Sequence, residues 1–521
     1  VLEWQKRDAM RNAFIVQPPA QRDAQRGASN IERLADIGRR IADLDRTLAA
    51  DFPNYAGLAE PEPLSVSEVQ DQLRPNEALV LFLAAPQWKP AEEATFVWVV
   101  TKTASRWVKT RLGSTALRDR VDALRCGLDY EGSWTGSRCF DLLNTAFTED
   151  DRRNGKPLPF SLHRAHSLYR ELFGRLENMI AGKDLLVVPS GPLTQLPFHV
   201  LVTKKPSRSD LTADNFRNAA WLVKQHSITV LPSVASLAAL RRHAKVSKAH
   251  KPLVGFGNPL LDGNPVDAWQ KAAARRARAI MGCAGRGGLA VGHLRQTAGS
   301  IKPLGRGLQP VDPAEIRFQA PLPETADELC EVARSVGATT RDIYLGARAT
   351  ETRIKSLSAT GTLATYKVLH FATHAAIAGE LRSSNEPGLI LSPPERASSS
   401  DDGYLSASDV ASLRLDAEWV ILSACNTAGG RTRNAEALSG LARAFFYAGA
   451  RSLLVSHWYV NSQATVELIT SAIAVLQGDR RIGQAGAMRK AMLGMMGPGK
   501  STWHPADWAP FIVVGEGAYH R

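Results

Sequence analysis

The sequence predicts an α/β protein made of two tandem α/β halves, each with a mainly parallel sheet covered by helices, preceded by an α-helical segment. Two observations lead to this fold class. From residue 77 onward, short apolar strands alternate with helices, which is typical of parallel strands covered on both faces. The chain also has 521 residues, which is too many for one ordinary hydrophobic core.

The amino-terminal segment, residues 1–50, is expected to be helical. Its apolar residues recur at spacings of three and four, with charged residues between them. This stripe, typical of an amphipathic or coiled-coil helix, comprises Ile31, Leu34, Ile37, Ile41, Leu44 and Leu48. The pattern ends before the prolines of DFPNYAGLAEPEPLS. So narrow a stripe needs a partner surface.

The first half, residues 53–248, begins with two predicted strands, EALVLFLAA and ATFVWVVT. The helix HRAHSLYRELFGRLENMIAGK follows, then the strand and turn DLLVVPSGPLTQLPF, the strand HSITVLPS and the helix SVASLAALRRHAKV. No His–Cys pair follows these strands, and we interpret His199 as structural.

The second half, residues 249–521, shows the same alternation of apolar strands and helices. Its predicted strands are KPLVGFGNP, YKVLHFATHAA, EWVILSACNTAGG, RSLLVSHWYV and WAPFIVVGE. The helix ETADELCEVARSVGA lies among them, with Thr325 as its expected cap. In sheets of this kind, functional sites lie outside the carboxyl ends of the strands.

The formal charge is +13 and the pI about 9.6, but much of the excess lies in one Gly-rich stretch. Residues 268–311 contain eight Lys or Arg and no Asp or Glu, which indicates a solvated loop and a candidate self-processing site. Nucleic acid is not expected as a partner, because only Trp269 in this stretch could stack on a base. No run of eighteen apolar residues occurs, so we expect no membrane span.

The cysteines are Cys126, Cys139, Cys283, Cys330 and Cys425. None form a C-x-x-C pair, and no metal site is expected. Cys126 and Cys139 either close a short disulfide loop or remain thiols, so the compartment stays open. The sequence starts without Met and without an apolar signal core, as expected of a fragment or a processed product. The sequence therefore leaves two alternatives open, a cytoplasmic protein or an exported one from which a signal segment has been removed.

Two strands of the second half lead into reactive side chains. Residues 368–373 run into His374, and residues 419–424 run into Cys425. If the two strands are parallel neighbours, a thiol and an imidazole emerge at one edge, which is the minimum for cysteine nucleophilic catalysis. Each has a structural alternative, a buried small residue for the Cys and a hydrogen-bonded core residue for the His. Walker, G-x-S-x-G and H-E-x-x-H motifs are absent, and no cofactor is expected.

Several ordered motifs resemble the CHAT family of caspase-like peptidases, which often follow tetratricopeptide repeats. They are VLHFATHAA, DGYLSASDVASL, VILSACNTAGG, EALSGLARAFFYAGARSLLVSHWYV and HPADWAPFIVVG, and the likeness covers about residues 50–515. The resemblance implies a caspase-like fold. Residues 1–52 would be the helical linker at the end of a repeat region, 53–248 the half without a dyad, and 249–521 the catalytic half.

The same resemblance implies roles for individual residues. His374 and Cys425 would form the catalytic dyad, and the backbone amides of Ala375 and Cys425 the oxyanion hole, although the family usually carries Gly after this His. Ser423 would line the specificity pocket. The substrate-binding strand, which would pair with peptide by β-addition, would comprise Ser456, His457 and Trp458. Asn461 follows where many relatives carry acidic residues, so no preference for a substrate side chain is assigned.

We therefore expect a cysteine endopeptidase that hydrolyses a protein or peptide substrate without metal or organic cofactor. The family architecture implies activation by a protein partner through the helical amino terminus. The alternative is a catalytically silent signalling or scaffold module that keeps the fold.

Overall fold

The computed structural model divides the chain into two units, residues 1–63 and 64–521, and almost all described residues belong to the second. The described residues are Asp36, Arg39 and 63–521, without 88–91, 208–210, 243–246, 281, 284–309, 399, 424–435, 459–461 and 518–521. The apolar stripe predicted for residues 31–48 lies outside the described residues. Within the part described, none of the helices is both long and apolar enough to span a membrane.

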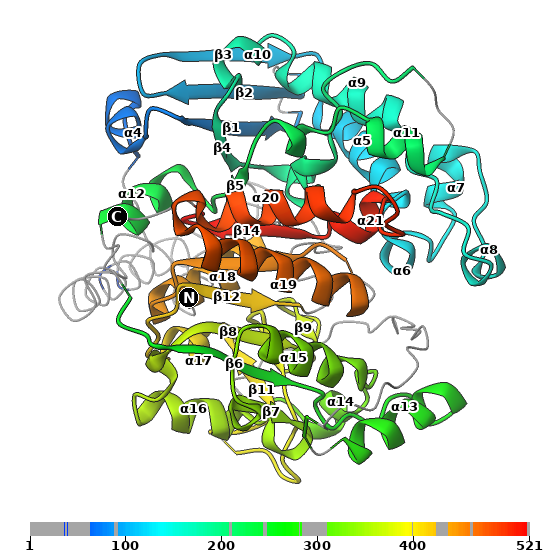
Figure 1. Cartoon of the computed structure of the whole chain (residues 1–521), viewed down its shortest axis with the longest axis vertical. Coiled ribbons are helices and arrows are strands. Elements are labelled where there is room, and N and C mark those ends of the chain that lie inside the picture. Colours follow the sequence, from blue (N-terminus) through cyan, green and yellow to red (C-terminus); the bar gives the residue numbers. More distant parts are fainter. Residues whose placement is uncertain are drawn as a thin grey trace, which may run out of the picture. The chain divides into compact units, whose positions relative to one another are not determined.

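An eleven-stranded sheet forms the centre of residues 64–521 in the part of the chain described, in the order β3-β2-β1-β4-β5-β14-β13-β12-β8-β6-β7 (Figure 1). Its strands are β1 (Glu77–Ala85), β2 (Ala94–Thr101), β3 (Ser105–Thr110), β4 (Asp184–Val188), β5 (Ile228–Val230), β6 (Lys251–Gly257), β7 (Ile343–Leu345), β8 (Tyr366–Ala372), β12 (Trp419–Leu422), β13 (Ser452–Ser456) and β14 (Phe511–Gly515). A small second sheet contains β9 (Ala375–Ala376), β10 (Gly388–Ile390) and β11 (Tyr404–Ser406). The α/β class and the mainly parallel sheet are confirmed.

The sheet continues across residue 248 because β14, a strand of the second half, lies between β5 and β13. It pairs in parallel with β5 and antiparallel with β13. The parallel strands of the first half therefore run opposite to those of the second half. As a result, the carboxyl ends of β8, β12 and β13 share an edge with the amino ends of β4 and β5.

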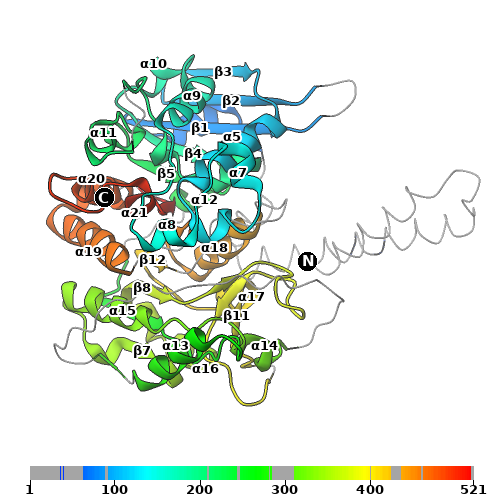
Figure 2. The same ribbon diagram turned by 90° about the vertical axis from the view of Figure 1, so that its right-hand side faces the viewer.

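Helices cover both faces of the sheet, which is why strands such as β12 and β13 are buried along their whole length. Figure 2 shows α15, α19 and α20 on one side of the sheet and α17 and α18 on the other. The helices are α4 (Val66–Gln72), α5 (Ser114–Cys126), α6 (Tyr130–Ser133), α7 (Arg138–Leu143), α8 (Glu149–Arg153), α9 (Leu162–Phe173), α10 (Glu177–Ile180), α11 (Ala213–Asn218), α12 (Val234–Arg242), α13 (Ala268–Ala279), α14 (Pro313–Arg317), α15 (Glu324–Ser335), α16 (Glu351–Ala359), α17 (Ala407–Ala411), α18 (Glu436–Ala448), α19 (Ser462–Gly478), α20 (Gly483–Met495) and α21 (Pro505–Trp508).

The cap predicted for α15 is wrong. The cap position is Pro323, and Thr325 lies inside the first turn. Its hydroxyl accepts a hydrogen bond from the backbone N–H of Asn258 at 2.8 Å and donates to the carbonyl of Leu322 at 2.7 Å. No side chain caps the helix at Pro323, and the hydroxyl of Thr325 instead fastens α15 to the turn after β6.

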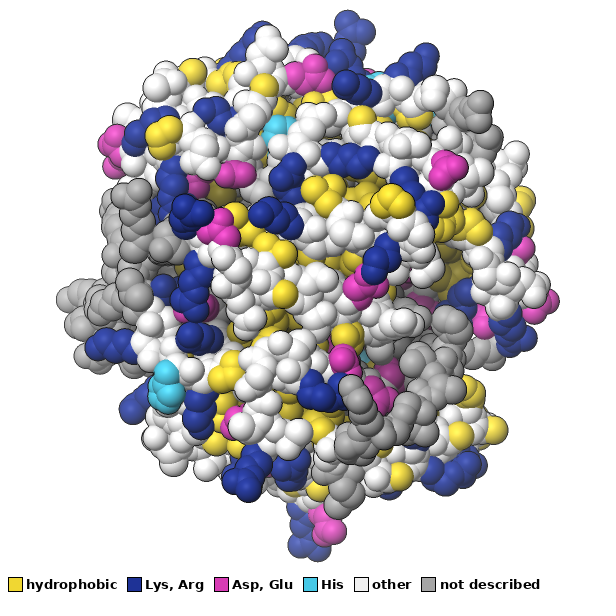
Figure 3. Space-filling view, viewed as in Figure 1, with side chains coloured by type: hydrophobic (Ala, Val, Ile, Leu, Met, Phe, Trp, Pro, Cys, Tyr) yellow, Lys and Arg dark blue, Asp and Glu magenta, His cyan; other side chains and the backbone are white. Residues whose placement is uncertain are grey.

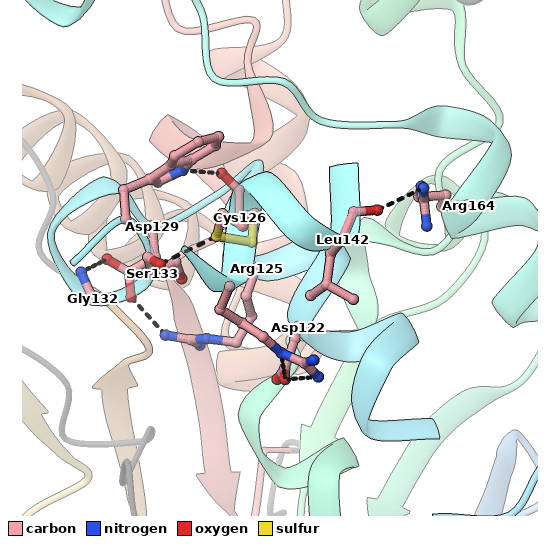
Figure 4. Close-up of a disulfide and its surroundings, with 11 residues drawn as sticks. Asp122, Arg125, Cys126, Asp129, Gly132, Ser133, Leu142 and Arg164 are labelled. Carbon is pink, nitrogen blue, oxygen red and sulfur yellow. Dashed lines mark hydrogen bonds and ion pairs between the residues drawn. A yellow bond between two sulfur atoms is a disulfide. The ribbon is translucent and has the colours of Figure 1, made fainter. Parts of the chain in front are cut away.

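Two disulfides join residues of neighbouring helices and loops. Cys126–Cys139 links the end of α5 to α7, and Cys283–Cys330 ties the segment after α13 to α15. Figure 4 shows the first of them beside the Arg125–Asp129 ion pair. Of the alternatives left open by the sequence, the disulfide is therefore the one present for Cys126 and Cys139. Of the five cysteines, Cys425 is the one that these two bonds leave over.

Candidate functional site

The site lies where β8 and β12 end at the same edge of the sheet. The two strands are parallel neighbours, with Leu422 beside Phe371. The register continues one step further, because the N–H of Ser423 donates to the carbonyl of Phe371 at 3.1 Å. His374 follows β8 at this edge. Cys425 comes two residues after Ser423 and lies outside the described residues, as does Asn461.

His374 is buried, with 8% of its surface exposed, and its ring is oriented by the backbone of the loop before α15. Its Nε2 lies 2.7 Å from the carbonyl oxygen of Ala320. A carbonyl can only accept, so Nε2 carries the hydrogen and the neutral ring keeps its lone pair on Nδ1. Burial lowers the pKa of His374 below its usual 6.5, although the bond to Ala320 acts in the opposite direction. The geometry therefore favours a neutral imidazole whose Nδ1 can take up a proton.

Ala375 opens the short strand β9, which pairs antiparallel with β10. Ala375 lies opposite Leu389, and the N–H of Ile390 donates to the carbonyl of His374 at 2.9 Å. In an antiparallel ladder this pattern marks a pair that lies between the hydrogen-bonded positions. The N–H of Ala375 is therefore not used by β10, as a backbone donor for a developing oxyanion requires.

Ser423 is partly buried and forms a cluster with the buried side chains of His370 and Glu328. Its Oγ donates to Oε1 of Glu328 at 2.6 Å, and Nε2 of His370 lies 3.0 Å from both Ser423 Oγ and Glu328 Oε1. His370 has no exposed surface, and its Nδ1 has no partner within the described residues. These bonds fix the Ser423 side chain and tie β8, β12 and α15 together at the floor of the site.

A cavity of about 20 Å³, large enough for one water molecule, opens above this cluster. Its lining contains two carboxyl groups and several hydroxyl groups. The lining residues are Leu322, Glu324, Thr325, Glu328, Thr373, Ser423, Ser456, Trp458, Ser462, Thr465 and Phe511. Three of the predicted substrate-binding residues, Ser423, Ser456 and Trp458, are thus brought together.

The strand predicted to pair with peptide is already paired on both edges. β13 lies between β12 and β14, with Ser456 opposite Phe511. The next N–H, of His457, donates to the carbonyl of Pro510 at 2.7 Å. The backbone of this strand up to His457 is therefore already engaged within the sheet. Trp458 itself is held by a hydrogen bond from its indole Nε1 to the carbonyl of Ala506 at 3.0 Å.

The side chain of His457 does not line the cavity. It is 1% exposed, and neither ring nitrogen has a partner within the described residues. Burial, Arg125 and His199 lower its pKa well below 6.5, so the ring is neutral. Its carbonyl, however, accepts a hydrogen bond from the Arg125 guanidinium at 3.4 Å, which connects this segment to α5 in the first half.

Sequence reasoning missed the contribution of α15. Glu324 and Glu328 both line the cavity, and their spacing of four places them on one face of a helix. That spacing was readable in ETADELCE, but nothing in the sequence says which strand ends the helix covers. Within the described residues, no group of three or more His, Cys, Asp or Glu side chains could hold a metal ion.

Comparisons with known proteins give distant relatives. Tetratricopeptide repeat protein 28 of Mus musculus is 27% identical over 229 residues, and that of Homo sapiens is 26% identical over 226 residues. Both matches cover 37% of this chain, which spans less than a tenth of the length of these curated relatives.

Among solved structures, a chain in two crystal structures of the Saccharomyces cerevisiae separase–securin complex resembles this one. The matches have TM-scores of 0.39 and 0.42 at 8% identity, and cover 86% of this chain and 30% of that chain. The model of the CHAT domain matches residues 162–516, which is more than half of the sequence. The chain therefore belongs to the CHAT-domain family.

Proposed function

We propose that this chain is a cysteine peptidase of the caspase-like type, with Cys425 as nucleophile and His374 as general base and acid. The observation that carries the proposal is the state of His374. It follows β8 at the edge where β12 leads towards Cys425, and its Nε2 bond to Ala320 leaves Nδ1 as the proton acceptor. Two disulfides engage the other four cysteines, which leaves Cys425 as the candidate thiol.

In this reaction the Cys425 thiol gives its proton to Nδ1 of His374, and the thiolate attacks the carbonyl carbon of the peptide bond. The negative charge on the carbonyl oxygen is stabilised by the N–H groups of Ala375 and Cys425. His374 then protonates the leaving amine, and a thioester remains on Cys425. Water, deprotonated by His374, attacks the thioester and releases the acid product and the thiol.

The substrate is a protein or peptide that pairs with the backbone from Trp458 onward and places one side chain near Ser423. The family's association with tetratricopeptide repeats supports activation by a protein partner at the amino-terminal segment. The curated relatives carry such repeats in their names.

The test compares the full chain with Cys425→Ala on a peptide library, and His163→Ala serves as a control because His163 is exposed on α9. We expect cleavage by the wild type and by His163→Ala, and none by Cys425→Ala. Equal cleavage by wild type and Cys425→Ala would refute the proposal.

A second candidate is a catalytically silent signalling or scaffold module, and Ala375 is the observation in its favour. A methyl group stands where resembling peptidases carry Gly, beside the amide that would bind the oxyanion. A thiol-directed activity probe separates the two candidates. Labelling of Cys425 that is lost in His374→Ala supports the peptidase, and no labelling supports the silent module.

A further inference from the structure

A second cavity, of about 420 Å³, lies at the edge of the sheet opposite the proposed catalytic site. Its size is that of a site for a small organic molecule. It opens where β8 and β12 begin and β14 ends, since Val368, Trp419 and Glu516 are among its lining residues. Figure 3 shows several Lys and Arg side chains on the left of the face drawn, the side on which β12 begins in Figure 1.

The inner part of the cavity is apolar. Val336, Val368, Trp419, Ile473 and Leu476 line it, from α19, the end of α15 and the first residues of two strands. Trp419 is 2% exposed, and its indole N–H has no acceptor within the described residues.

The charged residues that line the cavity have more positive than compensating negative groups. Glu516 accepts hydrogen bonds from Arg241, and Glu418 lies 3.6 Å from the Arg480 guanidinium, so both lining carboxylates have cationic partners. Lys367 is half-buried, and its ammonium group has no hydrogen-bond or ion-pair partner within the described residues. Arg451 has only a long contact, 3.9 Å, with Asp416.

Lys367 and Arg451 can act on one ligand. The residues just before β12 pair with both: the N–H of Glu418 donates to the carbonyl of Lys367, and the carbonyl of Ala417 accepts from the N–H of Arg451. The backbones of Lys367 and Arg451 therefore lie on either side of the start of β12. Two strand spacings are about 10 Å, which two long side chains that line the same cavity can bridge to one anionic group.

We propose that this cavity binds a small monocarboxylic acid with an apolar aryl or alkyl body. The carboxylate is held by Lys367 and Arg451 at the rim, and the apolar body lies against Trp419, Ile473 and Leu476. This cavity is separate from the proposed dyad, so the binding proposal does not depend on peptidase activity.

The test uses two acids, 4-phenylbutyrate and decanoate, and the uncharged amide of each, titrated into the full chain by calorimetry. Every titration is repeated on Cys425→Ala, which separates binding from any thiol chemistry. We expect saturable one-to-one binding of at least one acid to both proteins, with a Kd below about 1 mM, and binding of its amide about tenfold weaker.

Three variants locate the site. Lys367→Met should weaken binding of the acid about tenfold and leave the amide unchanged. Leu476→Trp should abolish binding of both, because the larger ring fills the apolar part. Lys271→Met, an exposed lysine on α13, is the matched control and should bind as the wild type does.

The proposal is overturned if neither acid binds at about 5 mM, if acid and amide bind equally, or if the affinity survives both Lys367→Met and Leu476→Trp. Because Lys367 is on the rim, a folded Lys367→Met keeps the test decisive even where Leu476→Trp does not fold.

Discussion

The state of His374 has a kinetic consequence at the scale of a single residue. Burial holds its pKa below 6.5, so the imidazole stays neutral over a wider acidic range than a free histidine. If neutral His374 is the base, kcat/KM should remain level from about pH 8 down to about 6.5 and fall only below that. A pH profile of peptide cleavage checks this. An acid limb centred above 6.5 would contradict the described environment of the ring.

The cluster of Glu328, His370 and Ser423 makes a prediction for stability. Glu328→Leu removes the acceptor from two buried donors, and we expect the free energy of unfolding to fall by at least about 2 kcal/mol. Urea denaturation measures the loss. The control is the double variant Glu328→Leu with Ser423→Ala, which lacks the Ser423 hydroxyl that Glu328→Leu would leave without an acceptor. The stability losses of the two single variants, Glu328→Leu and Ser423→Ala, should therefore sum to more than the loss of the double variant. Simple additivity would mean that the hydrogen bond between these side chains contributes nothing.

His374 and Glu328 show what can be predicted from the sequence and what cannot. His374 is predictable as a candidate because a strand pattern leads directly into it, and such a local pattern is visible in a sequence. Glu328 was missed because its role depends on which strand ends α15 covers, 95 residues away from Ser423. A contact across that separation is set by packing of the whole sheet, and no local pattern encodes it.

At the scale of elements, the bond Cys126–Cys139 fixes the end of α5 to α7 across 13 residues. Replacing both cysteines by Ser should lower the free energy of unfolding by about 3 kcal/mol, because the unfolded chain regains the freedom of that loop. The bond Cys283–Cys330 spans 47 residues, and its loss should cost about 4 kcal/mol. Chemical denaturation of the two double variants measures both values. Unchanged stability of either variant, or of the wild type in reductant, would contradict the bonding described.

The elements themselves were largely readable from the sequence. Strands such as β1, β12 and β13 stand out because buried parallel strands are nearly continuous apolar runs. The start of α15 was misplaced by two residues, because Thr325 looks like a cap in sequence but is engaged by the backbone of Asn258. The strands β7, β10 and β11 have three residues each, too few for a periodicity of their own, whereas the equally short β5 lies within the predicted strand HSITVLPS.

At the scale of the molecule, Arg241 connects distant parts of residues 64–521. From α12 it donates to Glu77 at the start of β1 at 2.6 Å, and to Glu516 after β14 at 2.8 Å. Arg241→Met should cost about 3–5 kcal/mol, because it leaves two buried carboxylates without their main partner.

Arg74 is the matched control for Arg241. It approaches the same carboxylates only at 3.5 and 3.7 Å and is about a third exposed. Arg74→Met should therefore cost less than about 1 kcal/mol. Thermal and urea unfolding of both variants provide the comparison. Equal losses would show that Arg241 is not the principal partner of these carboxylates.

The α/β class was predictable, whereas the single sheet was not. The sequence divides into two blocks in which strands and helices alternate, and each block predicts a separate sheet of its own. Only the pairing of β14 with β5 and β13 joins them, and strand order is a property of the folded chain.

Because β14 lies at the centre of the sheet but near the end of the chain, the sheet can be completed only late in biosynthesis. β5 ends at residue 230 and β14 begins at residue 511, so a ribosome adds 280 further residues before the second neighbour of β5 begins to be made. At ordinary translation speeds this takes roughly 15 to 60 s. During that interval the nascent chain exposes an unpaired hydrophobic edge, the kind of surface that seeds aggregation. Production of this protein should therefore depend on chaperones that hold emerging chains, and slow translation between these two strands should lower the soluble yield.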